Sequence, residues 1–157
     1  MSWRATATVP DRLFSVLPYL LPLFYGVQFG GFLFEMFPVL TVILIPVIPV
    51  ALLYSIPFAG FAVFMVLYLL VVRNDAIAYF IRFNTMQALL LGIVLFLCQL
   101  VQTVLGNIAG LELMLKVFSN FVFIGVVGVV VYAVVQSLRG IYAEIPTISE
   151  AVKSQVG

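Results

Sequence analysis

The sequence predicts an all-α integral membrane protein with four transmembrane helices and a proline-rich interfacial or re-entrant segment between the first and the second. Of its 157 residues, 65% are hydrophobic and 8% are charged, whereas a soluble domain has about 25% charged residues. The mean hydropathy is +1.29. So few charges cannot cover a surface that faces water. A chain of this length forms one bundle, so we expect a single multi-pass domain over residues 1–157.

Uncharged runs divide the chain, because a charge at the bilayer centre costs at least about 2.5–3.5 kcal/mol. The runs are Leu13–Phe34, Met36–Val72, Phe83–Leu111 and Val117–Leu138. All but the second have the length of one span, since about 20 helical residues cross a hydrocarbon core of about 30 Å. No small-residue cleavage site follows the first run, so we interpret it as a retained signal-anchor and first span.

Loop charges distinguish four spans from five. With spans at about residues 13–30, 52–72, 84–105 and 117–137, the basic residues divide six to one between the two sides. The six lie on one side: Arg4, Arg12, Arg73, Arg82, Arg139 and Lys153. Only Lys116 lies on the other. Two crossings within the second run would reduce the bias to four against three. Because cytoplasmic loops carry the excess of Lys and Arg, we expect four spans with both termini on the cytoplasmic or stromal side.

The segment Phe37–Val50 is the most unusual part of the sequence. Prolines recur in the uncharged run that contains it, at Pro38, Pro46, Pro49 and Pro57. Each removes a backbone donor and disrupts a helix interior. With four spans this segment lies on the non-cytoplasmic side as an interfacial or re-entrant segment. Non-helical backbone at that depth must be buried in protein or face a water-filled cavity.

Two short helices are expected outside the spans. Asn74 or Asp75 is a candidate N-cap for an interfacial helix in the cytoplasmic connection between the second and third spans. Ser149, which follows Pro146 in the polar tail, is a candidate N-cap for a brief terminal helix.

The sequence contains no motif for catalysis, metal binding or cofactor binding. It has no His and one Cys, and its six carboxylates are scattered. Nucleophilic catalysis needs a base beside a nucleophile, and metal sites need clustered ligands. A net charge of +1 without a basic cluster excludes a nucleic-acid surface. The predicted spans contain no ionisable residue of the kind that proton- or ion-coupled transporters use.

Gln99 and Gln102 share one face of the third predicted span with Gly106. This intramembrane polar face is either the lining of a polar path or a set of hydrogen bonds between helices. Such interhelical bonds are worth about 0.6 kcal/mol each. We favour the hydrogen-bonding interpretation.

Two segments mix polar and apolar residues in an order that hydropathy does not dictate: YFIRFNTMQALLL at Tyr79–Leu91 and VVQSLRGIYAEIP at Val134–Pro146. In these segments, and in DRLFSVLPYLLPL at Asp11–Leu23, the chain resembles the family of the twenty-kilodalton membrane subunit of the chloroplast inner-envelope protein translocon (Tic). It is most similar to the cyanobacterial or plastid-encoded members. The resemblance implies a four-helix membrane protein that, in plastids, takes part in moving preproteins across the inner envelope.

The resemblance also implies a location and partners. The membrane would be the cyanobacterial inner or thylakoid membrane, or the plastid inner envelope. The partners would be the lipid bilayer, other translocon subunits and a preprotein substrate, and oligomerisation stays open. The family has no established catalytic residues to place on this chain.

The resemblance does place structural candidates at the cytoplasmic rim. They lie at the mouths of the third and fourth spans: Arg82, Asn84, Gln87, Gln136, Arg139 and Glu144. An ion pair from Arg82 or Arg139 to Glu144 would tie the two span ends together. A polar rim around a channel mouth is the alternative, and we favour the tie.

The leading functional hypothesis is therefore a non-enzymatic membrane subunit of a protein-translocation or membrane-insertion assembly. One alternative is a structural or assembly-factor membrane protein without a conducting role. A small-solute channel also stays open, because the sequence lacks a ring of charges for selectivity but not polar residues.

Overall fold

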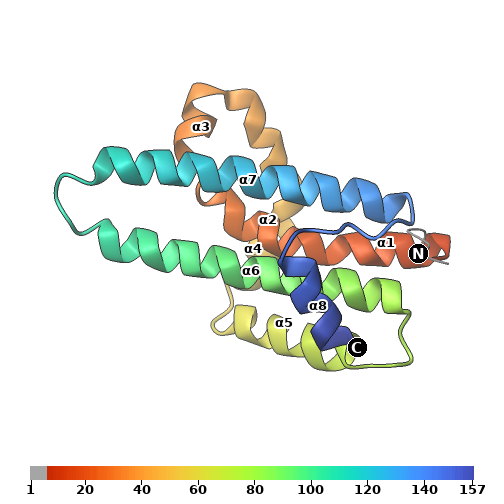
Figure 1. Ribbon diagram of the computed structural model, residues 1–157. Coiled ribbons are helices and arrows are strands. Elements are labelled where there is room, and N and C mark those ends of the chain that lie inside the picture. Colours follow the sequence, from red (N-terminus) through yellow and green to blue (C-terminus); the bar gives the residue numbers. More distant parts are fainter. Residues whose placement is uncertain (1–6) are drawn as a thin grey trace.

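Two long antiparallel helices form the frame of the molecule (Figure 1). The computed structural model describes residues 7–157, and every secondary-structure element in that range is a helix. The long helices are α6 (Tyr79–Leu105) and α7 (Glu112–Leu138), each of 27 residues. At about 1.5 Å per residue each is longer than a hydrocarbon core of about 30 Å. Both are also apolar enough to cross a bilayer, so the prediction of an all-α membrane-type fold is confirmed.

The N-terminal segment packs against both long helices. It is helical in three successive parts: α1 (Val9–Val16), a 3₁₀ turn (Leu17–Tyr19) and α2 (Leu20–Val27). A capping box starts α1, because Thr8 Oγ1 accepts a hydrogen bond from Asp11 N and Asp11 Oδ2 accepts one from Thr8 N. Pro18 and Pro22 have no N–H to donate, and the 3₁₀ turn lies where the α-helical ladder is interrupted.

Two glycines, one in α2 and one directly before α3, allow this segment to approach α7 closely. A Cβ at Gly26 would overlap Val126 Cγ1, and one at Gly30 would lie 2.8 Å from Phe123 Cε2. By contrast, a Cβ at Gly125 or Gly128, on another side of α7, would meet nothing within 4 Å. Small residues at helix contacts are the usual means of close packing in membranes.

The proline-rich segment is helical rather than irregular. It comprises α3 (Gly31–Met36), a 3₁₀ helix (Pro38–Val47) and α4 (Ile48–Tyr54), and its later parts fold back against α2 (Figure 1). Helical backbone satisfies most of its own amides, which removes the need for the water-filled cavity that an irregular segment would require. Val39, Val42 and Ile45 expose their side chains.

A sharp bend follows α4. Pro38–Tyr54 and Ala59–Val72 meet at 104°, which is the geometry of a broken span or of a re-entrant loop. The chain turns at Pro57 and Phe58, and Phe58 has a left-handed φ of 63°. The second predicted span, 52–72, therefore contains this bend and is not one continuous helix. Its helical part, α5 (Ala59–Leu67) with a π-helical turn (Tyr68–Val72), rises only about 21 Å.

The number of spans is lower than predicted when counted by helix length and composition. Within residues 7–157, α6 and α7 each qualify, and the bent pair makes a third when it is counted as one span. The first predicted span, 13–30, does not enter this count, because the 3₁₀ turn divides it into α1 and α2 of eight residues each.

The long helices extend beyond the apolar runs. The third and fourth spans were predicted at 84–105 and 117–137, whereas α6 begins at Tyr79 and α7 at Glu112. The expected interfacial helix before the third span is absent from the described residues, because Asn74 Oδ1 accepts a hydrogen bond from Ala76 N and closes a turn. Hydropathy marks only the part of each helix that faces hydrocarbon.

The tail returns to the bundle after α7. The terminal helix predicted from the sequence is present as α8 (Ile148–Val156), and it packs across α6 (Figure 1). Its N-cap is Thr147 rather than Ser149. The reason is that the Ser149 hydroxyl lies within the first turn and is buried against α6.

Candidate functional site

A buried polar network lies near the start of α6, where Asn84 and Gln87 are both 0% exposed. They are three residues apart and therefore on the same face of the helix. A buried carboxamide that finds no hydrogen-bond partner costs about 1–3 kcal/mol. Both side chains have partners, and those partners come from three other segments of the chain.

Gln87 joins α6 to the N-terminal segment and to the tail. Its Nε2 donates to Tyr19 Oη at 3.0 Å and to the Ala143 carbonyl oxygen at 2.9 Å. Its Oε1 accepts from Ser149 Oγ at 2.7 Å. Ser149 Oγ in turn accepts from Ile145 N at 2.7 Å. Both amide hydrogens and the carbonyl oxygen of Gln87 are therefore satisfied by protein groups.

Asn84 joins α6 to α7 and to the same tyrosine. Its Oδ1 accepts from Tyr19 Oη at 2.8 Å and from Ser137 Oγ at 2.9 Å. Its Nδ2 donates to the Phe80 carbonyl oxygen at 2.9 Å. The Tyr19 hydroxyl thus donates to one carboxamide and accepts from the other. The network closes on itself, and in this structure neither amide lines an open mouth.

Arg82, near the start of α6, binds other partners than the predicted Glu144. Its Nε donates to the Val72 carbonyl oxygen at 2.9 Å and its Nη2 to the Val156 carbonyl oxygen at 3.1 Å. Nη2 also lies 3.0 Å from Asp75 Oδ1. The guanidinium therefore connects the end of the π-helical turn, the following turn and the last residues of α8.

The predicted ion pair between an arginine and Glu144 is not formed among residues 7–157. Glu144 Oε1 instead accepts from Lys153 Nζ at 2.8 Å, and this hydrogen bond raises the pKa of Lys153. Arg139 Nη1 donates to Gln136 Oε1, one turn earlier on α7, at 3.0 Å. The sequence argument failed here because α8 folds back and brings Lys153 nearer to Glu144 than either arginine.

The residues SLRG at the end of α7 form a Schellman motif. Gly140 N donates to the Ser137 carbonyl oxygen and Ile141 N donates to that of Gln136. Gly140 has φ +73°, which favours glycine, and a Cβ there would lie 2.8 Å from Arg12 Nε. The glycine thus turns the tail toward α6 and leaves space for an arginine of α1.

The intramembrane polar face lies toward the other end of the bundle. Gln99 Nε2 donates to Gln28 Oε1 at 2.9 Å, and Gln102 Nε2 donates to Ser119 Oγ at 2.6 Å. The two glutamines thus form hydrogen bonds to the end of α2 and to α7. Gln102 and Ser119 also line a polar pocket of about 310 Å³ that contains Glu112 and Lys116.

Three members of the buried network were not singled out from the sequence: Tyr19, Ser137 and Ser149. Tyr19 lies in an apolar run, where an aromatic residue is usually a packing residue or an interfacial residue. Ser137 is part of the VVQSLRG segment and Ser149 was considered only as a cap. The sequence did offer one indication for Tyr19 and Ser137: both are polar residues inside the segments that carry the family resemblance.

The chemistry available to the network is hydrogen bonding alone. Carboxamides and serine hydroxyls carry no charge, and the network contains no base beside a nucleophile of the kind that covalent catalysis requires. Within residues 7–157, no group of three or more His, Cys, Asp or Glu residues is placed to hold a metal ion.

Apolar helices of membrane-spanning length, joined at one end by a closed polar network, define a helical integral membrane protein. The family model described as chloroplast import apparatus Tic20-like matches residues 4–152. The chain is 46% identical to a Tic20 family protein of Synechocystis sp., over 99% of both chains. This protein therefore belongs to the Tic20 family, as the resemblance predicted.

Relatives from plants and red algae are also similar over most of the chain. Protein TIC 20-II, chloroplastic, of Arabidopsis thaliana is 36% identical, over 93% of this chain and 72% of that protein. The Tic20 family protein Ycf60 of Gracilaria tenuistipitata is 34% identical, over 95% of this chain and 76% of that protein. All the helices α1 to α7 lie within the residues that the family model matches.

The bond between Gln87 and Ser149 can be tested by a double-mutant cycle. We expect Gln87→Leu and Ser149→Ala each to lower the free energy of unfolding in detergent by about 1–3 kcal/mol, because each leaves a buried polar group without its partner. The double variant should cost about 1 kcal/mol less than the sum. The control is Gln136→Leu, which should be additive with Ser149→Ala. Additivity for the Gln87 pair would contradict the network.

Proposed function

We propose that this protein is a non-catalytic membrane subunit of a protein-translocation assembly, built as one domain over residues 1–157. The observation that carries the proposal is the family relationship, which spans residues 4–152 and therefore nearly all the helices and the whole polar network. The family description names a chloroplast import apparatus, and the Arabidopsis relative is named as a chloroplastic TIC protein.

The geometry favours a role in assembly rather than chemistry. Each member of the network uses its polar groups to hold one segment of the chain against another, so the network gives the bundle a defined shape at one end. Arg82 extends this connection to the end of α8. A rigid end of this kind suits a subunit that presents a fixed surface to other translocon subunits or to a preprotein. Its membrane would be a cyanobacterial inner or thylakoid membrane, or the plastid inner envelope.

We also propose that the chain crosses its membrane four times, with both termini on the cytoplasmic or stromal side. The start of α1, the start of α6 and the end of α7 lie at one end of the bundle, and the loop between α6 and α7 lies at the other (Figure 1). Arg12 lies in the first turn of α1, Arg82 in the first turn of α6 and Arg139 directly after α7. Lys116 lies near the start of α7, beside the loop. This distribution supports the six-to-one charge bias of the sequence.

On this proposal α1 and α2 together form the first span. The segment from Val9 to Val27 is nearly continuous, and at about 1.5 Å per residue it reaches about 28 Å. The second span is α5 with its π-helical turn, completed by the apolar residues before the bend. A short second span is compatible with a locally thinned bilayer.

The topology is tested by cysteine accessibility in a Cys98→Ser background. Cysteines at Ala76 and Ser154 should be protected from an impermeant thiol reagent in intact cells or right-side-out vesicles and should react after permeabilisation. A cysteine at Asn107, in the loop between α6 and α7, should react with the reagent without permeabilisation. Reaction of Ala76 but not Ser154 from outside would contradict four spans.

The function is tested by photocrosslinking in native membranes. Phe121 of α7 is 80% exposed and Phe123 of the same helix is 3% exposed. We expect a photoreactive phenylalanine analogue at Phe121 to crosslink to other translocation subunits or to a preprotein, identified by mass spectrometry. The analogue at Phe123 should crosslink only within the chain. Crosslinks from Phe121 only to non-translocation membrane complexes would contradict the proposal and favour an assembly factor.

A further inference from the structure

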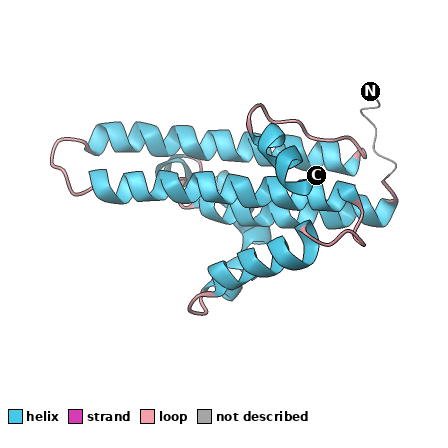
Figure 2. Ribbon diagram, turned by 60° about the horizontal axis from the view of Figure 1, so that its bottom comes forward, coloured by secondary structure: helices cyan, strands magenta, loops and turns pink. Residues whose placement is uncertain are grey.

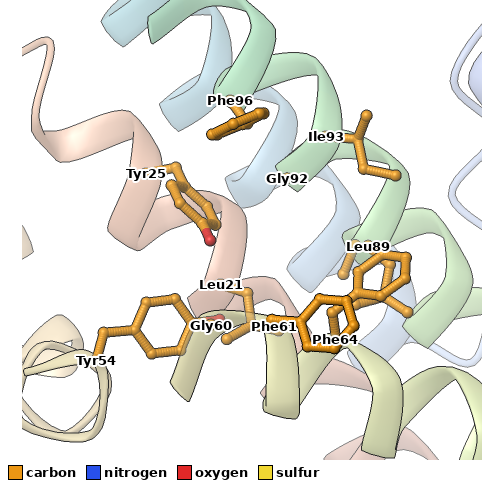
Figure 3. Close-up of a pocket in the computed structure, with 11 residues that line it drawn as sticks. Leu21, Tyr25, Tyr54, Gly60, Phe61, Phe64, Leu89, Gly92, Ile93 and Phe96 are labelled. Atoms are coloured by element: carbon orange, nitrogen blue, oxygen red, sulfur yellow. The ribbon is translucent and has the colours of Figure 1, made fainter. Parts of the chain in front are cut away.

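Helix α5 leans away from the bundle, and its π-helical end is the part that packs against α6 (Figure 2). Two cavities lie on the inner side of this region. The larger, of about 430 Å³, lies between the N-terminal segment, Val71 and the start of α6. The smaller, of about 260 Å³, lies deeper, between α2, α5 and α6 (Figure 3). Leu21 lines both cavities, so they are neighbours.

Together the two cavities follow one face of α6. The residues of α6 that line them fall on a single stripe: Ile81, Thr85, Ala88, Leu89, Gly92, Ile93 and Phe96. The distance along the helix from Ile81 to Phe96 is about 22 Å. We call this pair of cavities the α5 groove. It runs parallel to a helix of membrane-spanning length, and therefore along the direction of lipid chains.

The lining of the α5 groove is almost entirely hydrocarbon. In its deeper part, Tyr25 and Tyr54 close one side, and Phe64 and Leu89 close another (Figure 3). Gly60 and Gly92 leave space there, since a Cβ at Gly92 would lie 3.8 Å from the Tyr25 ring. Phe61 lines the groove and is 69% exposed. The groove is thus accessible from the lipid.

Thr85 is the polar exception. It lines the larger cavity and is 1% exposed, and its Oγ1 has no hydrogen-bond partner within residues 7–157. A threonine in a helix usually donates to the carbonyl four residues earlier, which here belongs to Ile81. A buried hydroxyl without a partner costs free energy. The oxygen itself is covered in this structure, but because it has no partner to lose, a rotation of the Thr85 side chain that turns it into the cavity breaks no hydrogen bond.

We propose that the α5 groove binds one acyl chain of a membrane glycerolipid, whose ester carbonyl accepts a hydrogen bond from Thr85 Oγ1. The groove is long, narrow and apolar, as an unbranched chain requires. Thr85 lies one helical turn inside Arg82, at the depth where the esters of a lipid follow its headgroup. A partner helix is about 10–12 Å wide, which cavities of this size do not accommodate. The proposal is independent of the translocation function.

The test compares two synthetic phosphatidylglycerols with equal chains, one ester-linked and one ether-linked, in native mass spectrometry of the purified full-length protein. Only the ester lipid offers a carbonyl. We expect the wild type to bind the ester lipid about three- to tenfold more tightly, the range of one neutral hydrogen bond. Thr85→Val keeps the shape of the side chain and should abolish the preference. Thr103→Val, at a hydroxyl bonded to the Gln99 carbonyl oxygen, should retain it.

A second variant tests where the acyl chain binds. Gly92→Leu places a side chain in the deeper cavity and should weaken binding of both lipids at least fivefold. Equal affinity of the wild type for the two lipids would overturn the proposal, as would an ester preference that survives Thr85→Val. Unchanged binding in a folded Gly92→Leu variant would place the lipid elsewhere and overturn the location. Should Gly92→Leu fail to fold, the ester and ether comparison decides alone.

Discussion

The hydrogen bonds of the Gln87 carboxamide are the interaction on which the rest of the structure depends. Membrane helices are not driven together by hydrophobic burial, because lipid is as apolar as their side chains, so packing and polar contacts decide how they associate. Gln87 contacts the N-terminal segment through Tyr19 and the tail through Ala143 and Ser149. Asn84 adds α7 through Ser137. One helical turn of α6 therefore binds the N-terminal segment, the end of α7 and the tail at this end of the bundle.

The three sequence segments that carry the family resemblance meet at this network. Tyr19 comes from the first, Asn84 and Gln87 from the second, and Ser137 and Ala143 from the third. Their specific order of polar and apolar residues has a structural explanation, since each polar group must reach a partner in another segment. The arginines at the same end act outside the network, where their long side chains can extend toward the interface. The region around α5 is packed differently, and the cavities lie there.

Hydropathy and charge predicted α6 and α7, because long uncharged runs have few alternatives to a spanning helix. The prolines indicated where helices are interrupted but not how, and so the N-terminal segment and the bend before α5 differ from the predicted spans. Asn84 and Gln87 were chosen by resemblance, whereas their partners lie more than 50 residues away in sequence and no local pattern identifies them. The predicted partner of Glu144 was wrong, because its actual partner, Lys153, is brought close only by the way α8 folds back.

Hydrogen exchange of α8 tests the central claim most directly, because α8 is held on α6 partly through Ser149. With Gln87→Leu, the amides of Ile148–Val156 should exchange much faster than in the wild type, while those in the middle of α7 keep their protection. Gln99→Leu, which removes a hydrogen bond at the other end of the bundle, should leave α8 unchanged. Unaltered protection of α8 in the Gln87 variant would contradict the account, because it would show that the tail is positioned without the buried carboxamide.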